Sequence, residues 1–336
     1  MPASILMSSN NKQRLRHEGE STPPSPPPPP PPAEVTPPAE NAEQDGSECT
    51  DSVRSLRRRM RAMARAKGIP FPDSPPPRPS LIESIPMARE LLDAGGEVIY
   101  KKFSSCVVKH GCGTRVTKFN INGIRPSEVE AMRFVSEHTT VPVPRIYDVG
   151  EKHLTLELIE GETLEKAWKD TLSADDKALV ARQLRDYIGQ LRAVKSPDGV
   201  IGSFGGRPAI DTGRFYPEEG GPFAGEASFN DFLVAGLAER VPNVCEIIRG
   251  QMREDHEIVL THGDLHAINI IARPGVGVAA IIDWELAGFY PEYLDLVRPF
   301  KLADWSCGYY HELLNIFPQR YDAELVVELS RQCWYR

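Results

Sequence analysis

The chain has 336 residues, 40% of them hydrophobic, so it can bury a sizeable core in one large domain or two smaller ones. Up to Ser80 it holds 11 basic and 9 acidic residues, whereas the remainder holds 28 and 38 and carries a net charge of −10. An acidic folded part argues against a nucleic-acid partner. No apolar run approaches the roughly 18–20 residues of a membrane span, so we expect no membrane contact.

The cysteines and the N-terminus predict where the protein works. Six cysteines are scattered without a C-x-x-C pair, which indicates free thiols in a reducing compartment. The N-terminus lacks the charged and then apolar order of a secretory signal. We therefore expect a cytoplasmic protein, and we expect it to be a monomer.

Residues 1–80 are predicted to be a disordered tail. Prolines crowd residues 23–38 and 70–79. The run from Pro23 to Pro32 predicts a polyproline II rod, which is either a stiff spacer, the preferred interpretation, or a ligand for a proline-reading domain. The basic stretch Arg54–Lys67 could form one short helix against an anionic partner, although a solvated charge run is preferred. Residues 68–79 then close the tail as a linker.

The next part of the chain predicts a small β-rich lobe. A short helix within residues 81–96 ends at the glycine pair Gly95–Gly96. β-Branched runs at 97–103, 106–111 and 115–119 follow, with Gly111–Gly113 as a hairpin turn. A helix over 126–138 is expected to begin with Ser127 as N-cap and Glu130 completing a capping box. Runs at 145–150 and 154–161 complete a five-stranded antiparallel sheet with one inserted helix.

From Thr163 the pattern becomes helical and predicts a larger α-rich lobe. A helix starts at a Ser173 cap and places four apolar residues on one face: Val180, Leu184, Ile188 and Leu191. A Gly/Pro-rich stretch from Gly199 to Gly225 interrupts the pattern, and such a long loop usually carries function. A helix over 227–241 follows, and residues 257–288 predict two strands flanking polar loops. The remainder is mostly helical, and a cleft is expected between the lobes.

Two polar loops carry the chemistry. His262, Gly263 and Asp264, followed after four residues by Asn269, have the H-x-D-x-x-x-x-N spacing of a kinase catalytic loop. Asp283, in the sequence IIDWE, lies 14 residues beyond Asn269, after an apolar strand, where kinases place a metal-binding aspartate. On these motifs the chain resembles the aminoglycoside phosphotransferase family, in the form abundant in filamentous fungi, over roughly residues 97–295.

The resemblance implies an α+β, protein-kinase-like, two-lobed fold that uses ATP and Mg²⁺. We predict three parts: the tail over residues 1–80, a small antiparallel β-rich N-lobe that binds nucleotide over 81–161, and a larger α-helical C-lobe over 162–336. The C-lobe would hold the catalytic loop and the acceptor site.

Phosphoryl transfer needs positioned oxygens and neutralised charge more than covalent chemistry. Asp264 would orient the acceptor hydroxyl and take its proton, while the hard oxygens of Asn269 and Asp283 would hold Mg²⁺. His262 would brace the loop through hydrogen bonds, and an approach of His266 to substrate or phosphate stays open. A zinc site is disfavoured, because no third soft ligand has suitable spacing.

The small lobe should supply a lysine for the nucleotide phosphates and a helix glutamate that orients it. Glu130 is the predicted glutamate. Lys118 and Lys109 both qualify as the lysine, and Lys118 is preferred because it falls on the third strand of the hairpin region. Ser104 and Ser105 occupy the phosphate-loop position, which lacks a Gly-rich motif.

Three further positions are expected near the site. Backbone groups from Glu157 to Ile159 would meet adenine. Glu285 could assist with a metal or a cationic substrate, or make a structural hydrogen bond. Asp295 is expected to tie its helix to the catalytic loop.

The preferred function is ATP-dependent phosphorylation of a hydroxyl on a small molecule, as in aminoglycoside or choline kinases. The alternatives are a catalytically silent kinase-like binding module and, less favoured, a protein kinase. A protein kinase usually carries a Gly-rich loop, an arginine where Gly263 stands, and an A-P-E-type segment. The segment from Gly199 to Gly225, with Arg207, Asp211 and Arg214, is expected to border the acceptor site.

Overall fold

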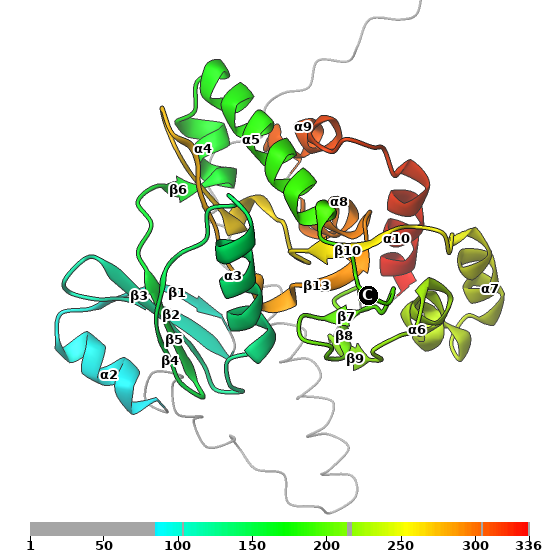
Figure 1. Cartoon of the computed structure of the whole chain (residues 1–336), viewed down its shortest axis with the longest axis horizontal. Coiled ribbons are helices and arrows are strands. Elements are labelled where there is room, and N and C mark those ends of the chain that lie inside the picture. Colours follow the sequence, from blue (N-terminus) through cyan, green and yellow to red (C-terminus); the bar gives the residue numbers. More distant parts are fainter. Residues whose placement is uncertain (1–84, 103, 214–216, 304, 335–336) are drawn as a thin grey trace, which may run out of the picture. The chain divides into compact units, whose positions relative to one another are not determined.

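The computed structural model describes residues 85–102, 104–213, 217–303 and 305–334, which belong to one compact unit (Figure 1). The predictions for the tail, namely the proline-rich rod, the basic helix and the linker, lie outside the described residues, as does Arg214. The lobe boundaries at residues 80 and 161 stay predictions.

The N-lobe is built on one antiparallel sheet of five strands. These are β1 (Glu97–Lys102), β2 (Ser105–Lys109), β3 (Arg115–Asn120), β4 (Ile146–Val149) and β5 (His153–Glu157). Their order is β1-β2-β3-β5-β4, and every neighbouring pair is antiparallel. Helix α3 (Pro126–His138) is inserted between β3 and β4. The predicted sheet with one inserted helix is therefore confirmed.

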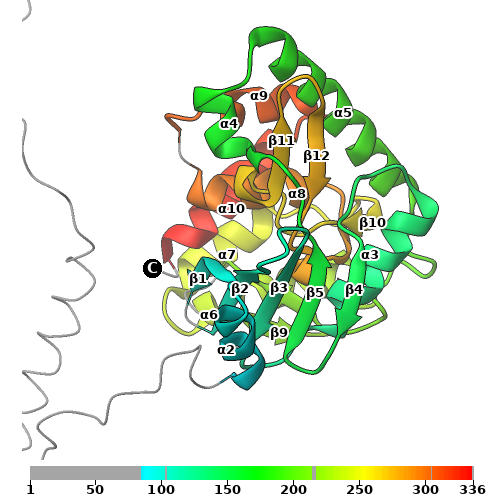
Figure 2. The same ribbon diagram turned by 90° about the vertical axis from the view of Figure 1, so that its left-hand side faces the viewer.

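Alternation along the strands gives this sheet two different faces. Cys106, Val108 and Phe119 pack with Ala88 of helix α2 (Pro86–Asp93), which covers one face of the sheet (Figure 2). Because side chains alternate along a strand, Lys118 of β3 projects from the opposite face. This face turns toward α3 and the C-lobe, and it carries the lysine into the interior of the molecule.

Helix α3 begins one residue earlier than its expected cap. Its first residue is Pro126, its N-cap is Arg125, and no side chain caps it, so the predicted capping box of Ser127 and Glu130 is wrong. Proline at the first helical position has the φ angle that a helix needs, and its missing N–H is not required there. Ser127 and Glu128 therefore lie in the first turn, both of them buried.

The C-lobe is mainly helical. Its longest helix, α5 (Ala174–Ala193), starts at a Ser173 cap with a full capping box from Asp176, and it buries the four predicted apolar residues. The other helices are α4 (Leu164–Asp170), α6 (Glu226–Ala238), α7 (Pro242–Gln251), α8 (Leu294–Val297), α9 (Tyr309–Ile316) and α10 (Asp322–Trp334). Within the part of the chain that is described, no helix is long and apolar enough to cross a membrane.

Short strands frame the two polar loops of the C-lobe. Two strands were predicted within residues 257–288, whereas residues 257–291 hold four strands in two sheets. They are β10 (Ile258–Thr261), β11 (Ile270–Arg273), β12 (Gly277–Ile281) and β13 (Gly288–Pro291). The outer strands β10 and β13 pair with each other, and so do the inner strands β11 and β12. This nested pairing brings the ends of β10 and β12 together, and both polar loops start there.

Four further two- or three-residue strands complete the lobe. They are β6 (Glu162–Thr163), which extends the β11–β12 pair, β7 (Gly202–Ser203), which pairs with β13, and the pair β8 (Ala209–Asp211) and β9 (Glu218–Gly220). The last three lie in the Gly/Pro-rich stretch, so that segment is ordered at these positions and attached to the strand that follows Asp283.

Candidate active site

The catalytic-type loop and the metal-type loop are joined directly. The first connects β10 to the 3₁₀ turn η1 (Ala267–Asn269), and the second connects β12 to the 3₁₀ turn η2 (Trp284–Leu286). The Ile282 N–H donates to the Asn269 carbonyl at 2.8 Å. Asn269 therefore lies one residue away from Asp283 across this bond.

His262 braces the first loop, as predicted. Its side chain is fully buried and packs edge-on against Trp284, with ring centroids 4.6 Å apart. Nδ1 accepts the Asp264 N–H at 3.2 Å, and Nε2 lies 3.0 Å from the Ile282 carbonyl. Both nitrogens are thus occupied by the protein, and His262 acts as a strut between the two loops.

Two charged residues near α8 hold the backbone of the same loop. The buried Asp295 carboxylate accepts the N–H groups of His262 and Gly263 at 2.9 and 2.7 Å, which confirms its predicted tie to the loop. Burial raises the pKa of Asp295, against the opposing effects of His262 and these two N–H donors. Arg298 donates to the Gly263 carbonyl at 2.9 Å. The N–H groups of His262 and Gly263 and the carbonyl of Gly263 therefore all have hydrogen-bond partners within the protein.

Gly263 allows the loop its sharp turn. Its φ is +82°, and a Cβ atom at this position would lie 2.2 Å from the Leu286 carbonyl oxygen. Glycine adopts such angles freely, whereas other residues are strained there. The absence of a side chain lets the catalytic-type loop lie against η2, directly beside the metal-type loop.

The side chain of Asn269 is hydrogen-bonded to Asp264. Asn269 Nδ2 donates to the Asp264 carbonyl and to its Oδ2, both at 2.9 Å, and His266 Nε2 lies 3.5 Å from Oδ1. The Asp264 side chain is 32% exposed, so a carboxylate held on one side still faces solvent on another. Because the amide donates through nitrogen, its oxygen points elsewhere and can serve as a hard ligand.

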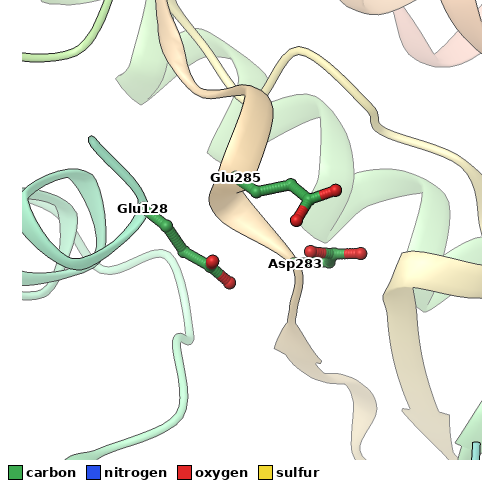
Figure 3. A group of neighbouring side chains, drawn as sticks. All are labelled: Glu128, Asp283 and Glu285. Atoms are coloured by element: carbon green, nitrogen blue, oxygen red, sulfur yellow. The ribbon is translucent and has the colours of Figure 1, made fainter. Parts of the chain in front are cut away.

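Lys118 of the N-lobe meets three carboxylates from two elements. Its Nζ lies 2.9 Å from Glu128 of α3, 2.7 Å from Asp283 and 3.0 Å from Glu285. Oxygens of the three carboxylates lie within 4.8 Å of one another, and Figure 3 shows them pointing to one place. Asp283 has φ +65°, the left-handed region that a non-glycine residue rarely adopts. This strained backbone turns the metal-type aspartate toward the N-lobe lysine.

The charges in this cluster do not cancel, because three carboxylates surround one ammonium. Burial alone would lower the pKa of Lys118, but Asp283, Glu128 and Glu285 outweigh it and raise the pKa well above its ordinary value. Burial raises the pKa of Glu128 to about 7, since the attraction of Lys118 is opposed by repulsion from Asp283 and Glu285. The site therefore holds excess negative charge that a cation would offset.

The glutamate that meets Lys118 is Glu128, and the prediction of Glu130 is wrong. Since α3 starts at Pro126, its buried stripe contains Glu128, Ala131, Met132 and Val135, with the 3- and 4-residue spacing of one helix face. Glu130 lies off this stripe and is 43% exposed. In the sequence, extending the same 3- and 4-residue spacing one turn back from Met132 leads to Glu128, and this is the signal that could have identified it.

Comparison with known proteins identifies the family. The model described as "Phosphotransferase enzyme family" (APH) matches residues 125–327, more than half of the chain. The chain belongs to this phosphotransferase family. A search of curated proteins found no match. The family match begins at Arg125 and therefore does not include Lys118, whose place in the site comes from the geometry alone.

Solved structures were compared with this fold. The gentamicin–APH(2")-IIa complex aligns with a TM-score of 0.50 at 15% identity, over 74% of this chain and 85% of that one. The aminoglycoside phosphotransferase APH(3'')-Id of Streptomyces rimosus gives 0.48 at 20% identity, over 74% and 96%. The macrolide 2'-phosphotransferase MphH of Brachybacterium faecium gives 0.45 at 17%, over 70% and 80%. The predicted α+β, protein-kinase-like fold is confirmed, while the filamentous-fungal form stays a prediction.

In this phosphotransferase, the remaining predicted nucleotide contacts lie around the N-lobe sheet. The Ser104 carbonyl accepts the Ile121 N–H at 2.9 Å and Ser105 opens β2, so this segment forms the β1–β2 turn. The N–H groups of Glu157 and Leu158 donate to carbonyls within the lobe, at 2.9 and 3.0 Å. Ile159 follows directly. The expected contact with adenine at Glu157–Ile159 stays a prediction. Because the N–H groups of Glu157 and Leu158 already have acceptors, we expect that contact at Ile159.

Two residues predicted to border the acceptor site have structural partners. The buried Asp211 carboxylate accepts from both terminal nitrogens of Arg331 on α10, at 2.8 and 3.1 Å, while its position beside the acceptor stays a prediction. A buried carboxylate needs such a partner, and the sequence places it 120 residues away. Arg207 pairs with Glu130 at 2.7 Å and so connects the Gly/Pro-rich segment to α3. Among the described residues, Lys109 takes no part in the Lys118 cluster.

Proposed function

We propose that this protein transfers the γ-phosphate of ATP to a hydroxyl group of a small molecule. One observation carries the proposal: Lys118 of the N-lobe lies 2.7 Å from Asp283 of the C-lobe, although 165 positions separate them in the sequence. A lysine and a carboxylate from opposite lobes are the pair that a nucleotide triphosphate and its metal require in this fold. Asp264 and Asn269, bonded to each other, stand in the adjacent loop.

The donor set fits Mg²⁺. Its members are carboxylate and amide oxygens, the hard ligands that Mg²⁺ prefers, and three of the carboxylates gather within 4.8 Å. Asp283 and Asn269 would hold the ion, with Glu285 close enough to contribute. When bound with nucleotide, Mg²⁺ would offset the charge that develops on the transferred phosphoryl group. The excess negative charge of the cluster favours such a cation.

The protein's own residues have distinct tasks in this reaction. Lys118, kept charged and oriented by Glu128, would contact the nucleotide phosphates. Asp264 would accept a hydrogen bond from the acceptor hydroxyl, orient it toward the γ-phosphate and take its proton as the new P–O bond forms. The Asn269 amide fixes the Asp264 carboxylate through Nδ2. The braced loop thus presents one carboxylate oxygen to the acceptor without further rearrangement.

The acceptor is proposed as a small molecule for two reasons. The polypeptide runs from η2 directly into β13 and α8 without the long segment that a protein kinase uses to hold a peptide. The family match itself describes phosphotransferases, whose solved neighbours of the same fold carry aminoglycosides in their names. We also propose that the protein is cytoplasmic and monomeric.

The experiment measures the release of ADP or GDP that depends on phosphorylation of an acceptor. Purified full-length protein is incubated with Mg·ATP, or Mg·GTP, and a panel of hydroxyl compounds that includes amino-sugars, choline and macrolides. ADP or GDP release is scored by coupled assay, and the phosphorylated product by mass spectrometry. GTP is included because backbone contacts at Ile159 do not determine the base. The proposal predicts acceptor-dependent release for at least one compound.

The variant Asp264→Ala separates catalysis from binding. It should bind Mg·ATP as wild type does, while turnover falls by about 10² or more, because general-base catalysis contributes that much. The matched control is Asp322→Ala, an exposed aspartate that pairs with Arg320 and should keep full turnover. Turnover unchanged in Asp264→Ala would refute the role of Asp264. Nucleotide binding without any turnover in wild type would instead indicate a kinase-like binding module.

A further inference from the structure

We propose that a clamp from the C-lobe, formed by Phe204, Arg207 and Glu219, holds helix α3 so that Glu128 stays against Lys118. The inference rests on the proposed function in one respect, since it makes these residues positioning residues for nucleotide binding. It concerns a set of contacts outside the cluster already described. In Figure 1 the segment that carries β7, β8 and β9 lies beside α3.

Two ion pairs of opposite polarity join the clamp to α3. Arg207 binds both oxygens of Glu130 through its two terminal nitrogens, at 2.7 and 2.8 Å. Arg125, the N-cap residue of α3, donates to Glu219 of β9 at 2.8 Å. The helix thus contributes one acid and one base, and the clamp contributes the complementary base and acid. A helix shifted along its axis would bring like charges closer, so the pairs fix its register.

An aromatic stack reinforces the ion pairs. The Phe134 ring of α3 lies 5.4 Å from the Phe204 ring, and the Phe204 ring lies 5.9 Å from that of Phe289 on β13. Such centroid separations are typical of favourable aromatic pairs. The stack therefore runs from the N-lobe helix, through the clamp, to the strand that follows the metal-type loop.

The C-lobe end of the clamp is firmly attached. The Phe204 N–H donates to the carbonyl of Ala287, which ends η2, at 2.9 Å. Strand β7, immediately before Phe204, pairs with β13 at Ser203 and Gly202. The Arg207 Nη1 atom also donates to the Phe204 carbonyl at 2.7 Å, so the guanidinium is held before it reaches the helix. The clamp is therefore continuous with the loop that carries Asp283.

The geometry of α3 connects the clamp to the lysine. Glu128 and Glu130 are two residues apart, which places them about 200° apart around the helix axis. Lys118 binds the helix on one side through Glu128, while Arg207 binds it on nearly the opposite side through Glu130. Without the Arg207–Glu130 contact, helix α3 can rotate or move away, and this movement weakens the contact between Lys118 and Glu128.

The size of the effect follows from exposure. Arg207 and Glu130 are 36% and 43% exposed, and exposed ion pairs contribute about 1 kcal/mol or less. Full unfolding is therefore not expected from the loss of this pair. A fivefold change in nucleotide affinity corresponds to about 1 kcal/mol, and that is the expected scale.

The test is a charge-swap cycle read by Mg·ATP binding in isothermal titration calorimetry. Arg207→Glu and Glu130→Arg should each raise the Kd for Mg·ATP about fivefold. The double variant, which restores an opposite-charge pair, should recover most of that loss. Arg320→Glu, which removes an exposed arginine paired with Asp322, is the matched control and should leave the Kd unchanged. Single variants that bind as wild type, or a double variant that shows no recovery, overturn the clamp.

A second measurement separates this inference from the proposed function. Amide hydrogen exchange of residues 126–138 needs neither nucleotide nor turnover. Arg207→Glu should accelerate exchange in α3, and the double variant should restore protection, with exchange in α5 unchanged in both. If wild type fails to bind any nucleotide, the proposed function fails while this readout still decides the clamp. Unchanged exchange of α3 in Arg207→Glu would refute the clamp even in an active enzyme.

Discussion

The two halves of the candidate site are stabilised in different ways. In the C-lobe, the loop over residues 262–264 is held by buried bonds to its backbone, from His262, Asp295 and Arg298. In the N-lobe, the Lys118 ammonium is paired with side-chain carboxylates, and two of these partners, Asp283 and Glu285, are 37% and 36% exposed. The first half is preorganised, whereas the second can be rearranged by salt, metal or nucleotide.

This difference suits phosphoryl transfer. The carboxylate that orients the acceptor must be in place when the reaction occurs, so its loop gains from rigid support. The lysine and the acids around it must instead exchange partners when a metal and phosphates arrive. The exchange costs little free energy, because each carboxylate or ammonium that loses one charged partner gains another from the metal or the phosphates.

The largest expected effect breaks the rigid half. Gly263→Ala should destabilise the protein by about 3 kcal/mol or more and abolish turnover, because a Cβ would lie 2.2 Å from a backbone oxygen at a φ of +82°. The matched control is Gly275→Ala, which has φ +74° with nothing within 4 Å of the added Cβ. It should cost only about 1 kcal/mol. Urea denaturation gives both values, and equal losses would contradict the close packing of the two loops.

The next effect breaks the charged half. Lys118→Ala should lower kcat/KM for ATP by about 10², because its ammonium is the N-lobe's contact with the phosphates. Lys109→Ala, on the neighbouring strand β2, should remain within about twofold of wild type. Steady-state kinetics at varied ATP decides between them. A larger loss in Lys109→Ala would show that the strand assignment of the phosphate lysine is wrong.

The smallest effect sharpens the comparison through pH. In the C-lobe, the buried His256 bonds to Glu226 and Glu324 at 2.8 and 3.1 Å. Burial would lower its pKa, but the two glutamates outweigh burial and raise it. A histidine whose pKa is raised by folding adds stability below the unfolded value near 6.5, and this is lost as pH rises through the folded pKa.

The free energy of unfolding should therefore fall by roughly 1 kcal/mol, the size of one ordinary hydrogen bond, as pH rises above that window. Denaturation curves collected between pH 6 and pH 9 would show the slope, and His256→Gln should flatten it. A wild-type slope that persists in His256→Gln would assign the effect to other groups. Either way the change concerns the stability of the fold and leaves the bonds of the loop at Asp264 in place.

The sequence predicted the rigid half of the site better than the charged half. Asp264, Asn269 and Asp283 follow from fixed spacing within and after one loop, and the tie of Asp295 was expected. Glu130 is the glutamate predicted to meet Lys118, whereas in the structure the helix starts at Pro126 and buries Glu128. A shift of two residues along a helix changes its face, so the predicted partner of Lys118 was wrong.

Other features depended on pairings that sequence patterns do not contain. The nested arrangement of β10 to β13 was predicted as two strands, because short runs give no record of which neighbour they join. The Asp211–Arg331 and Glu130–Arg207 pairs connect residues 120 and 77 positions apart. Nothing in the spacing of these residues predicts their partners, which only the fold determines.

The most direct test of the account is the thermal stability of the wild-type protein with ATP, in the presence and absence of Mg²⁺. Ligand that binds only the folded state stabilises it by about 2.7 kcal/mol at 100 times its Kd, a shift well above the noise of a melting curve. We predict a rise in Tm with Mg·ATP that is much smaller with ATP alone and is lost in Asp283→Ala. An unchanged Tm with saturating Mg·ATP would contradict the assignment of this site to phosphoryl transfer.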